Sequence, residues 1–363
     1  MGLLVKRLEL RDFRSMAERD IDLSAGTTVL CGPNAAGKTN TVEALQMLTA
    51  GYSFRRPQPR QLVREGCQSA RVSARLEGDG RVVDVACNVA EGRRKFSKNG
   101  KGCHSADIAG TLMSVLFTPD DLALVKRGAS GRRDELDDFG RQANRGFSRV
   151  LASYQRTVEQ RNRLLKDENV DLGLLDAWDA SLAVGGAAVL AARLALFARL
   201  AAKTCEVYGL IAGGEGLECR YVCSLGEGVE GMGRDQLAEL FASRLAQGRP
   251  DDLRRQQTCV GPHRDDVEFL IDGRDARAYG SQGQQRSVVL ALKMAEVLLA
   301  EEIVGSKPLL LLDDVMSELD EGRREAVSRF SREGVQTVMT TTNLGYFSPD
   351  VLEGAEVVTY GGQ

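Results

Sequence analysis

One octapeptide carries the strongest chemical signal in this chain of 363 residues. Residues 32–39 read Gly-Pro-Asn-Ala-Ala-Gly-Lys-Thr and match the phosphate-loop pattern GxxxxGK[ST]. The pattern stands between a predicted strand at 28–31 and a predicted helix that begins near Thr39. In such a loop the backbone N–H groups surround a β-phosphate, and the helix N-terminus adds a favourable dipole. The octapeptide therefore predicts a nucleoside-triphosphate site.

Two side chains of the loop have predicted roles of their own. We expect Lys38 to reach the β- and γ-phosphates of ATP, and the Thr39 hydroxyl to ligate Mg²⁺. The other loop residues are expected to line the triphosphate through their backbone: Gly32, Pro33, Asn34, Ala35, Ala36 and Gly37.

A second motif supplies carboxylates. Residues 308–314 read Pro-Leu-Leu-Leu-Leu-Asp-Asp, an apolar strand that ends in two acids, as in a Walker B motif. An apolar run that ends in Asp is common, but beside a phosphate loop it is a strong signal. We expect Asp313 to hold Mg²⁺ through water and Asp314 to orient or deprotonate the attacking water.

The spacing of these motifs predicts the domain organisation. Lys38 and Asp313 must meet at one Mg²⁺-ATP, although 275 residues separate them. We therefore predict an α/β ABC-type P-loop ATPase head assembled from both chain ends (1–130 and 258–363), with an inserted, mainly helical lobe at 131–257 that forms a short arm. SMC-type proteins share this split layout.

A third motif stands 32 residues before Asp313. Residues 281–286 read Ser-Gln-Gly-Gln-Gln-Arg and precede a predicted helix, which resembles the signature of ABC proteins in its SMC-like form. The Ser281 hydroxyl, the Gly283 N–H and Gln284 are then expected to face a γ-phosphate held by the opposite subunit. Ser317 and Asp320 resemble the D-loop at the same interface. Together these residues predict an ATP-dependent homodimer.

The segment after the last predicted core strand departs from the ABC pattern. Where ABC proteins usually have a switch histidine, residues 340–343 read Thr-Thr-Thr-Asn, and we assign the switch role to Thr341. Walker B also ends in Asp314 where a glutamate is usual, so the base is one methylene shorter. Both departures predict slow hydrolysis, which suits a timer or clamp better than a motor.

The remaining elements follow from periodicity. Strand-like patterns predict strands at 3–10, 27–31, 218–224, 266–271 and 336–341, a buried apolar strand at 308–312, and a hairpin of 69–77 with 81–89 that turns at 78–80. Helical spacing predicts a long helix around 147–165, a second one from about Ala187 to Tyr208 after a polar break at 166–171, and a third at 284–303. Sustained heptads are absent, which excludes a long coiled coil.

Composition sets the cellular class. The chain is 43% hydrophobic and 27% charged, which is ordinary for a soluble globular protein. No run approaches the ~20 uninterrupted apolar residues of a membrane span, so we expect a cytoplasmic protein without a membrane partner. The eight cysteines have no zinc-like spacing and are expected to be free thiols. The net charge of −3 means that any DNA contact must come from a local basic patch.

At this point the chain resembles the RecF family of bacterial DNA replication and repair proteins. The resemblance runs nearly end to end and includes residues 10–15 (LRDFRS), 51–55 (GYSFR), 117–122 (FTPDDL), 160–162 (QRN), 261–266 (GPHRDD) and 280–298. Ala35 stands where the family usually has glycine, and Asn343 where it has aspartate. The resemblance implies a cytoplasmic protein that binds single- and double-stranded DNA, dimerises with ATP, and helps RecR and RecO load RecA at single-strand gaps.

Two basic runs are candidate DNA contacts. Arg55, Arg56, Arg60 and Arg64 follow the first helix, and Arg93, Arg94 and Lys95 begin a run in what we expect to be a glycine-containing loop that also holds Lys98 and Lys101. Each phosphate that they neutralise would make binding more salt-sensitive. A solvated surface is the alternative for the second run, and contact with ATP is the alternative for Arg55.

The sequence leaves several alternatives open. His263 is either catalytic or a hydrogen-bonding group in a turn, and we favour the turn. A transporter-coupled ATPase conflicts with the insertion, the missing switch histidine and the lack of a membrane segment. A purely architectural SMC-like role lacks long heptads, and a nuclease lacks a separate acidic metal site. DNA-stimulated ATPase activity would distinguish the favoured interpretation from the transporter.

Overall fold

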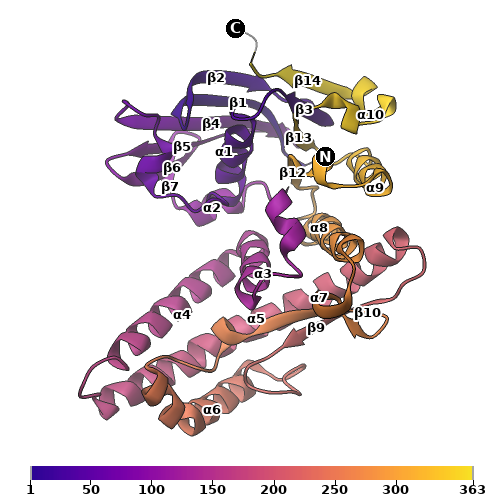
Figure 1. Cartoon of the computed structure of the whole chain (residues 1–363). Helices are drawn as coiled ribbons and strands as arrows, with labels where there is room; N and C mark the ends of the chain where they lie inside the picture. The colour runs from indigo at the N-terminus through magenta and orange to yellow at the C-terminus, as the bar shows by residue number, and fades with distance from the viewer. Residues whose placement is uncertain (1, 362–363) are drawn as a thin grey trace. The chain divides into compact units, whose positions relative to one another are not determined.

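The computed structural model describes residues 2–361 and contains two compact units (Figure 1). Met1–Ala123 and Val289–Gln363 form the first unit, and Leu124–Val288 forms the second. The first unit is thus assembled from both chain ends. The second unit is longer than the lobe predicted at 131–257, because residues 124–130 and 258–288 also pack within it.

The first unit contains an antiparallel sheet of six strands in the order β2-β1-β4-β5-β6-β7. Its strands are β1 (Leu4–Phe13), β2 (Met16–Asp22), β4 (Ser69–Gly78), β5 (Arg81–Ala90), β6 (Arg93–Lys98) and β7 (Lys101–Cys103). The hairpin of β4 and β5 is the one that the sequence predicts, with Gly78 paired to Arg81 across the turn. Side chains alternate across this sheet, so every second residue faces the core.

The same unit contains a mostly buried sheet of five parallel strands in the order β14-β3-β13-β12-β8. Its strands are β3 (Thr27–Cys31), β8 (Ser114–Phe117), β12 (Leu309–Asp313), β13 (Thr337–Thr341) and β14 (Ala355–Thr359). β3 comes from the first third of the chain and pairs directly with β13 and β14 from the last. The parallel sheet therefore joins the two chain ends and brings the ends of β3 and β12 into one layer.

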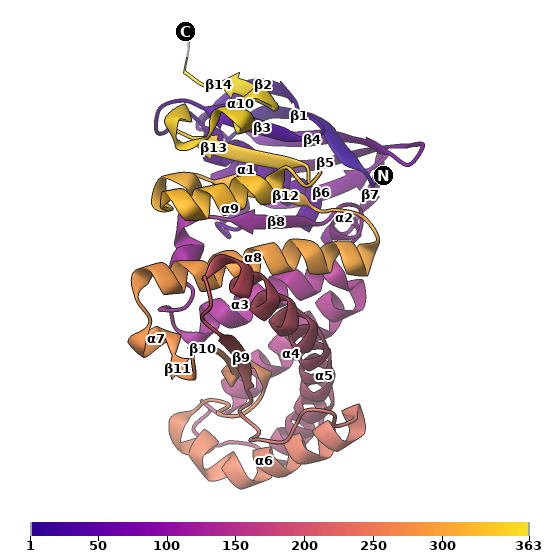
Figure 2. The ribbon, with the colours of Figure 1, turned by 90° about the vertical axis from the view of Figure 1, so that its right-hand side faces the viewer.

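Helix α1 (Lys38–Ala50) lies between these two sheets and contacts strands of both. Val42, Leu45 and Leu48 are fully or almost fully buried and belong to one core with residues of both sheets. Figure 2 shows α9 running alongside β12 and β13. The remaining helices of this unit are α2 (Ser105–Ala109), α9 (Glu321–Ser331) and α10 (Pro349–Glu353), with short 3₁₀ turns η1 (Pro59–Leu62), η2 (Pro119–Ala123), η4 (Val315–Glu318) and η5 (Leu344–Tyr346).

The second unit is mainly helical. Its helices are α3 (Ala129–Ala143), α4 (Arg145–Leu164), α5 (Leu172–Ile211), α6 (Arg234–Arg255) and α7 (Ala276–Tyr279), and α8 (Gln282–Val304) begins in it. A small antiparallel sheet in the order β11-β10-β9 is built from β9 (Leu217–Val222), β10 (Asp266–Ile271) and β11 (Arg274–Asp275), with η3 (Pro262–Arg264) before β10. Leu151 and Tyr154 of α4, Leu190 of α5 and Phe241 of α6 share one core.

Helix α5 corrects the sequence analysis, which began this helix near Ala187. It begins at Leu172, where Asp171 caps it by accepting a hydrogen bond from the Leu174 N–H. Its Gly186 is required by packing, because a Cβ there would lie 2.1 Å from the Phe241 ring. Glycine in a helix interior usually disfavours the helix, but here it allows α5 and α6 to approach closely.

The same helix has the length and composition of a membrane span, with a window of mean hydropathy 1.8 that is 39% buried. Charged residues interrupt its apolar runs, so the sequence did not predict a span there. In this structure α5 packs against α4 and α6 and buries two charged side chains, Asp179 and Arg193, in ion pairs. Packing between two neighbouring helices, with buried ion pairs, is typical of a core helix in a globular lobe.

A buried arginine joins three parts of the second unit. Arg161 of α4 is fully buried and donates hydrogen bonds to Asp179 of α5 at 2.6 Å and to Asp252 of α6 at 2.7 Å. The neighbouring Asn162 accepts hydrogen bonds from both the N–H and the hydroxyl of Thr258. These contacts give the family-like residues 160–162 a structural role.

Within residues 2–361, six strands were not predicted from the sequence: β2, β6, β7, β8, β11 and β14. β2 lies between the strands predicted at 3–10 and 27–31, which belong to different sheets. β8 was not predicted, since its four residues are too few for a period to show. Arg93–Lys98 was expected to be a loop, but it pairs with β5 as strand β6. Its residues are mostly polar and do not alternate between buried and exposed positions, so no period-two signal marks this strand.

Candidate nucleotide-binding site

The phosphate loop leads from β3 into α1, as its sequence predicts. Gly32 is required by a close approach, since a Cβ there would lie 2.4 Å from the Tyr360 carbonyl oxygen. Gly37 has φ 98°, and Ala35 has φ 65°. A left-handed backbone at a residue with a Cβ costs roughly 1–2 kcal/mol, so the loop is strained at Ala35. The loop therefore keeps the backbone shape that glycine usually provides.

The Lys38 and Thr39 side chains lie at the start of α1. Lys38 Nζ donates hydrogen bonds to the carbonyl oxygens of Gly32 (2.7 Å) and Pro33 (2.8 Å) and so lies over the loop. Thr39 Oγ1 donates to Asp313 Oδ1 at 2.9 Å, although the two residues are 274 positions apart. The fold therefore joins the phosphate loop and Walker B in one cluster.

The two acids at the end of β12 have different surroundings. Asp313 Oδ1 also accepts a hydrogen bond from Thr340 Oγ1 at 2.8 Å, and burial raises the pKa of this carboxyl despite these donors. Asp314 adopts a left-handed backbone with φ 54°, and its N–H donates to Thr340 Oγ1. Burial also raises the pKa of Asp314, while nearby Lys38 opposes that rise. Thr340 thus links the two acids.

One oxygen atom of this cluster has no partner within residues 2–361. Asp314 Oδ1 is buried and accepts no hydrogen bond there. Such an atom is costly unless something else satisfies it. It lies at a cavity of about 190 Å³ lined by Asn34, Ala35, Gly37, Lys38, Thr39, Asn40, Arg55, Asp314 and Thr340. The hydroxyl and carboxylate oxygens at this cavity are the hard ligands that Mg²⁺ prefers, so the residues fit that ion.

Arg55 belongs to this cavity through a buried glutamate. Glu43 of α1 is fully buried and accepts two hydrogen bonds from Arg14, at 2.6 and 2.9 Å. Arg55 Nη1 contacts the same carboxylate at 3.4 Å and donates to Asn40 Oδ1 at 3.0 Å. The glutamate thus holds the guanidinium of Arg55 at the cavity wall. This placement supports the alternative that Arg55 contacts ATP.

The switch assignment differs from the structure by one residue. Thr341 is buried and turned toward Asn343, whose carbonyl accepts from Thr341 Oγ1 and whose N–H donates to it. Thr340, not Thr341, lines the cavity. Successive side chains of β13 point to opposite faces of its sheet, so neighbouring threonines have different environments. Thr340 therefore replaces Thr341 as the candidate switch residue.

The signature segment lies in the second unit at the start of α8. Ser281 Oγ accepts from the Gln284 N–H at 3.2 Å, and Gln284 Oε1 accepts from the Ser281 N–H at 2.8 Å, which is a reciprocal helix cap. Gln285 fixes the preceding turn by donating to the carbonyls of Ala276 and Gly280. Gly283 begins the helix between these residues. The cap leaves the segment at a helix N-terminus, where a phosphate is favoured.

The two D-loop candidates lie beside Walker B. Ser317 Oγ donates to the Asp314 carbonyl at 2.8 Å. Asp320 caps α9 by accepting from the Arg323 N–H, and its carboxylate also pairs with the Arg323 side chain. Both residues therefore have local bonds that hold the segment after Asp314 in place.

Comparison with known proteins identifies the family. The family model for the RecF/RecN/SMC N terminal domain matches residues 4–350. The DNA replication and repair protein RecF of Symbiobacterium thermophilum is 40% identical over 94% of this chain and 92% of its own length. That of Heliobacterium modesticaldum is 36% identical over 97% and 96%. The chain belongs to the RecF family.

Solved structures agree with this assignment. The structure of the recombination mediator protein RecF-ATPrS in the RecFOR pathway has a TM-score of 0.90 at 32% identity, and covers 96% of this chain and 94% of that one. An Smc head bound to the C-winged helix domain of ScpA has a TM-score of 0.56 at 16% identity, which shows a shared fold. The expected fold class, an ABC-type head with an inserted helical lobe, is thereby confirmed.

The basic residues of this RecF family member fall into two groups. Arg55 pairs with Glu43, and Arg64 pairs with Asp12 at 2.8 Å, so two of the four arginines in the first run have acidic partners. Arg56 follows Arg55 with a left-handed backbone (φ 46°). In contrast, the structure over residues 2–361 shows no ion pair for Arg60, Arg93, Arg94 or Lys95, and the last three are exposed.

These four unpaired residues are neighbours. Arg60 Nε lies 3.9 Å from the position that a Cβ on Gly92 would take, at the turn into β6. Arg93 and Lys95 pair with Ala90 and Asn88, whereas Arg94 pairs with Val89 on the opposite face of the strand. The cluster therefore includes both faces of β6, and Arg60 of η1 lies beside the turn into this strand.

The sequence analysis missed three residues of the site region. Glu43 has no motif of its own, although a glutamate on an otherwise apolar helix face is a signal for a buried partner. Thr340 belongs to a run of three threonines in which only the strand register selects one. Glu215, which accepts a hydrogen bond from Gln284, lies 69 residues from it. No sequence pattern pairs those two residues.

Proposed function

We propose that this protein is an ATP-dependent DNA-binding protein of recombinational repair and replication restart. The observation that carries the proposal is the cluster of Thr39, Asp313 and Thr340 beside the unpartnered Asp314 oxygen, at a phosphate loop. The family assignment and the likeness to structures titled RecF-ATP and RecF-ATPrS support it.

ATP and Mg²⁺ are the proposed cofactors. The backbone of residues 32–37 surrounds the β-phosphate, and Lys38 exchanges the carbonyls of Gly32 and Pro33 for phosphate oxygens. Thr39 and Asp313 hold Mg²⁺, which neutralises charge on the phosphates. Asp314 accepts a hydrogen bond from the attacking water, and Thr340 holds its backbone in place. Arg55 contacts the phosphates from the cavity wall.

The signature segment acts in trans. In the proposed homodimer Ser281, Gly283 and Gln284 of one protomer contact the γ-phosphate bound by its mate, with Ser317 and Asp320 at the same interface. The N-terminus of α8 favours an anion at this place. Loss of the γ-phosphate removes the shared ligand, so slow hydrolysis releases the dimer.

DNA is the proposed macromolecular ligand, at single-strand gaps and in both single- and double-stranded form. The unpaired residues Arg60, Arg93, Arg94 and Lys95 make the phosphate contacts. Membership of the RecF family supports a cytoplasmic role together with RecO and RecR in loading RecA. ATPase activity is then weak and DNA-dependent, and serves as a release timer.

Sedimentation velocity of the full chain tests the proposal. We expect wild type to become a dimer when ATP and Mg²⁺ are added, because the signature residues complete the site of the mate. Ser281→Arg places a bulky cation at the α8 N-terminus and should remain a monomer while still binding ATP. Ser243→Arg, on an exposed position of α6, is the matched control and should dimerise. Dimers that form equally without ATP, or in Ser281→Arg, would overturn the composite site.

A further inference from the structure

Two cysteines of the second unit form a thiol pair. Cys205 lies near the end of α5 and Cys219 lies on β9, and their Sγ atoms are 3.9 Å apart. All eight cysteines of the chain are free thiols, and this is the one cysteine pair for which the structure, over residues 2–361, records a contact between sulfur atoms. A disulfide needs an S–S distance of about 2.05 Å, so the two sulfur atoms must approach by roughly 1.9 Å for the bond to form.

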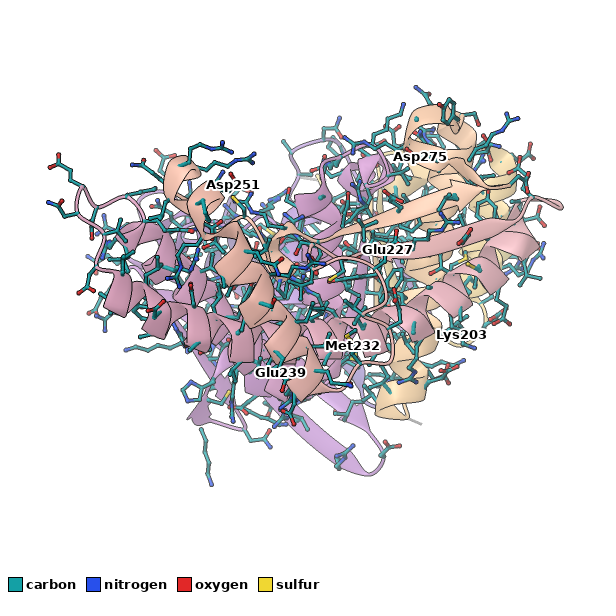
Figure 3. The ribbon with its side chains drawn as sticks, turned by 90° about the horizontal axis from the view of Figure 1, so that it is seen from below. Lys203, Glu227, Met232, Glu239, Asp251 and Asp275 are labelled. Carbon is teal, nitrogen blue, oxygen red and sulfur yellow. The ribbon has the colours of Figure 1, made fainter. Side chains whose placement is uncertain are left out.

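Small oxidants can reach this pair. Cys219 lines an open groove of about 1080 Å³ between α5, β9 and the loop that follows β9. Glu227 and Met232 of that loop lie over α5 (Figure 3). Cys205 and Cys219 are both half-buried, so neither sulfur is enclosed in the core.

The pair also has the electrostatics of a reactive thiol and its resolving partner. The contact between the two thiols lowers the pKa of Cys205 to about 7, because it stabilises the Cys205 thiolate. The pKa of Cys219 is raised by the same contact and by burial. Cys223, four residues after Cys219 and just past the end of β9, makes no thiol contact within residues 2–361, and burial raises its pKa to about 12. Near neutral pH, Cys205 is therefore the nucleophile.

We propose that Cys205 and Cys219 form a reversible disulfide when the protein meets hydrogen peroxide. The Cys205 sulfur attacks one peroxide oxygen, the O–O bond breaks, and Cys205 becomes a sulfenic acid as hydroxide leaves. The Cys219 sulfur then attacks the sulfenic sulfur, and the S–O bond breaks as the disulfide forms. The two departing hydroxides take the two thiol protons. Two thiols and one peroxide thus give one disulfide and two waters.

The disulfide would join the end of α5 to β9 and enclose residues 206–218, a segment that contacts the signature residue Gln284. The closed segment contains Glu215, which accepts hydrogen bonds from Tyr208 and from Gln284. Oxidation would therefore restrain the segment that holds Glu215, whose hydrogen bond with Gln284 supports the N-terminal turn of α8. The disulfide itself does not depend on the proposed ATP-driven dimer and can be tested without it.

Mass spectrometry of the full chain tests the pair directly. Trypsin cleaves after Lys203 and Arg220, so both cysteines fall in one peptide, residues 204–220. After mild peroxide treatment and alkylation, we expect this peptide to carry no alkyl group and to be lighter by two hydrogen atoms. Dithiothreitol should restore two alkylatable thiols. Further cleavage at Glu206, Glu215 or Glu218 should give fragments that separate only after reduction.

Three variants make the result specific. Cys205→Ser and Cys219→Ser should each abolish the bridged peptide, whereas Cys223→Ser, the matched control, should leave it unchanged. The proposal is wrong if residues 204–220 of the wild type stay doubly alkylated at peroxide concentrations that oxidise other thiols of the sample. It is also wrong if Cys205 proceeds to sulfinic acid without a bridge.

Discussion

Gln284 Nε2 donates a hydrogen bond to Glu215 Oε1 across 2.8 Å, and the other carboxylate oxygen of Glu215 accepts from the hydroxyl of the fully buried Tyr208 at 2.8 Å. Glu215 therefore connects the signature segment to the end of α5. A hydrogen bond to a charged group contributes about 1.5–3 kcal/mol, enough to fix a side chain that must meet a phosphate.

We predict that Glu215→Ala weakens ATP-driven dimerisation because Gln284 loses its support. The ATP concentration for half-maximal dimer formation should rise about tenfold, as expected from the loss of one such hydrogen bond. ATP affinity of the monomer should not change, since Glu215 is not at the phosphate loop. Glu215→Gln keeps a carbonyl acceptor for Gln284 and should retain most of the ATP-driven dimerisation. Glu227→Ala, which changes an exposed loop glutamate, is the control. Equal dimerisation of Glu215→Ala and wild type would show that the contact has no positioning role.

Asp314→Asn should stop hydrolysis while ATP-dependent dimers still form and persist. The amide cannot accept a proton from water, whereas Thr39 and Asp313 still hold the ion. We expect wild-type turnover below about one per minute per site, far from the ~10 s⁻¹ of typical enzymes. A single-turnover assay with radiolabelled ATP measures the hydrolysis rates of wild type and Asp314→Asn, with the exposed Asp350→Asn as control. Wild-type turnover near typical enzyme rates would contradict the proposal that slow hydrolysis sets the time of dimer release.

The pH dependence of hydrolysis should reflect Asp314. Burial raises its pKa above the usual value, and a general base must be deprotonated to act. Activity is therefore complete at neutral pH and falls as the pH drops through a pKa that lies higher than for an exposed aspartate. The acid limb of a kcat profile between pH 4 and 8 measures this position. A limb at or below the ordinary aspartate value would exclude Asp314 as the base.

The triple variant Arg93→Ala, Arg94→Ala, Lys95→Ala should bind DNA more weakly and with a flatter salt dependence. Each lost phosphate contact reduces the slope of log K against log[salt] by about 0.7–0.9. Fluorescence anisotropy with a labelled gapped duplex, measured from low to moderate salt, gives affinity and slope together. A second triple variant of exposed but ion-paired arginines, Arg220, Arg254 and Arg329, serves as control. Unchanged affinity in the first variant would remove this patch from consideration.

His263 should make stability depend on pH. It contacts Tyr154 and the Thr258 carbonyl, and burial, together with Arg264, Arg133 and Arg193, lowers its pKa to about 4. The unfolded chain binds the proton near pH 6.5. Its contribution is therefore complete above that pH and is lost as the pH falls toward 4, by about 2 kcal/mol between pH 7 and 5. Urea unfolding of wild type and His263→Gln at both pH values measures this difference. The exposed His104→Gln should behave like wild type.

The sequence by itself determined the motifs whose chemistry is local. A phosphate loop, an apolar strand ending in acids, and a capped helix N-terminus each work through consecutive residues, so residues 32–39, 308–314 and 281–284 could be recognised without a fold. The helices around 147–165 and 284–303 and the hairpin of 69–77 with 81–89 were predictable for the same reason, whereas α6 and the first part of α5 were not. Strand β6 was missed too, because its mostly charged residues show no alternation of apolar and polar positions.

Only the tertiary structure decided which residues meet. Thr39 reaches Asp313 because two strands from opposite chain ends lie in one parallel sheet. The register of β13 selects Thr340 over Thr341, since a shift of one residue reverses the face. The partners of Glu43, Glu215 and Cys205 likewise come from other elements. Such contacts depend on packing between distant segments, and no spacing along the chain encodes them.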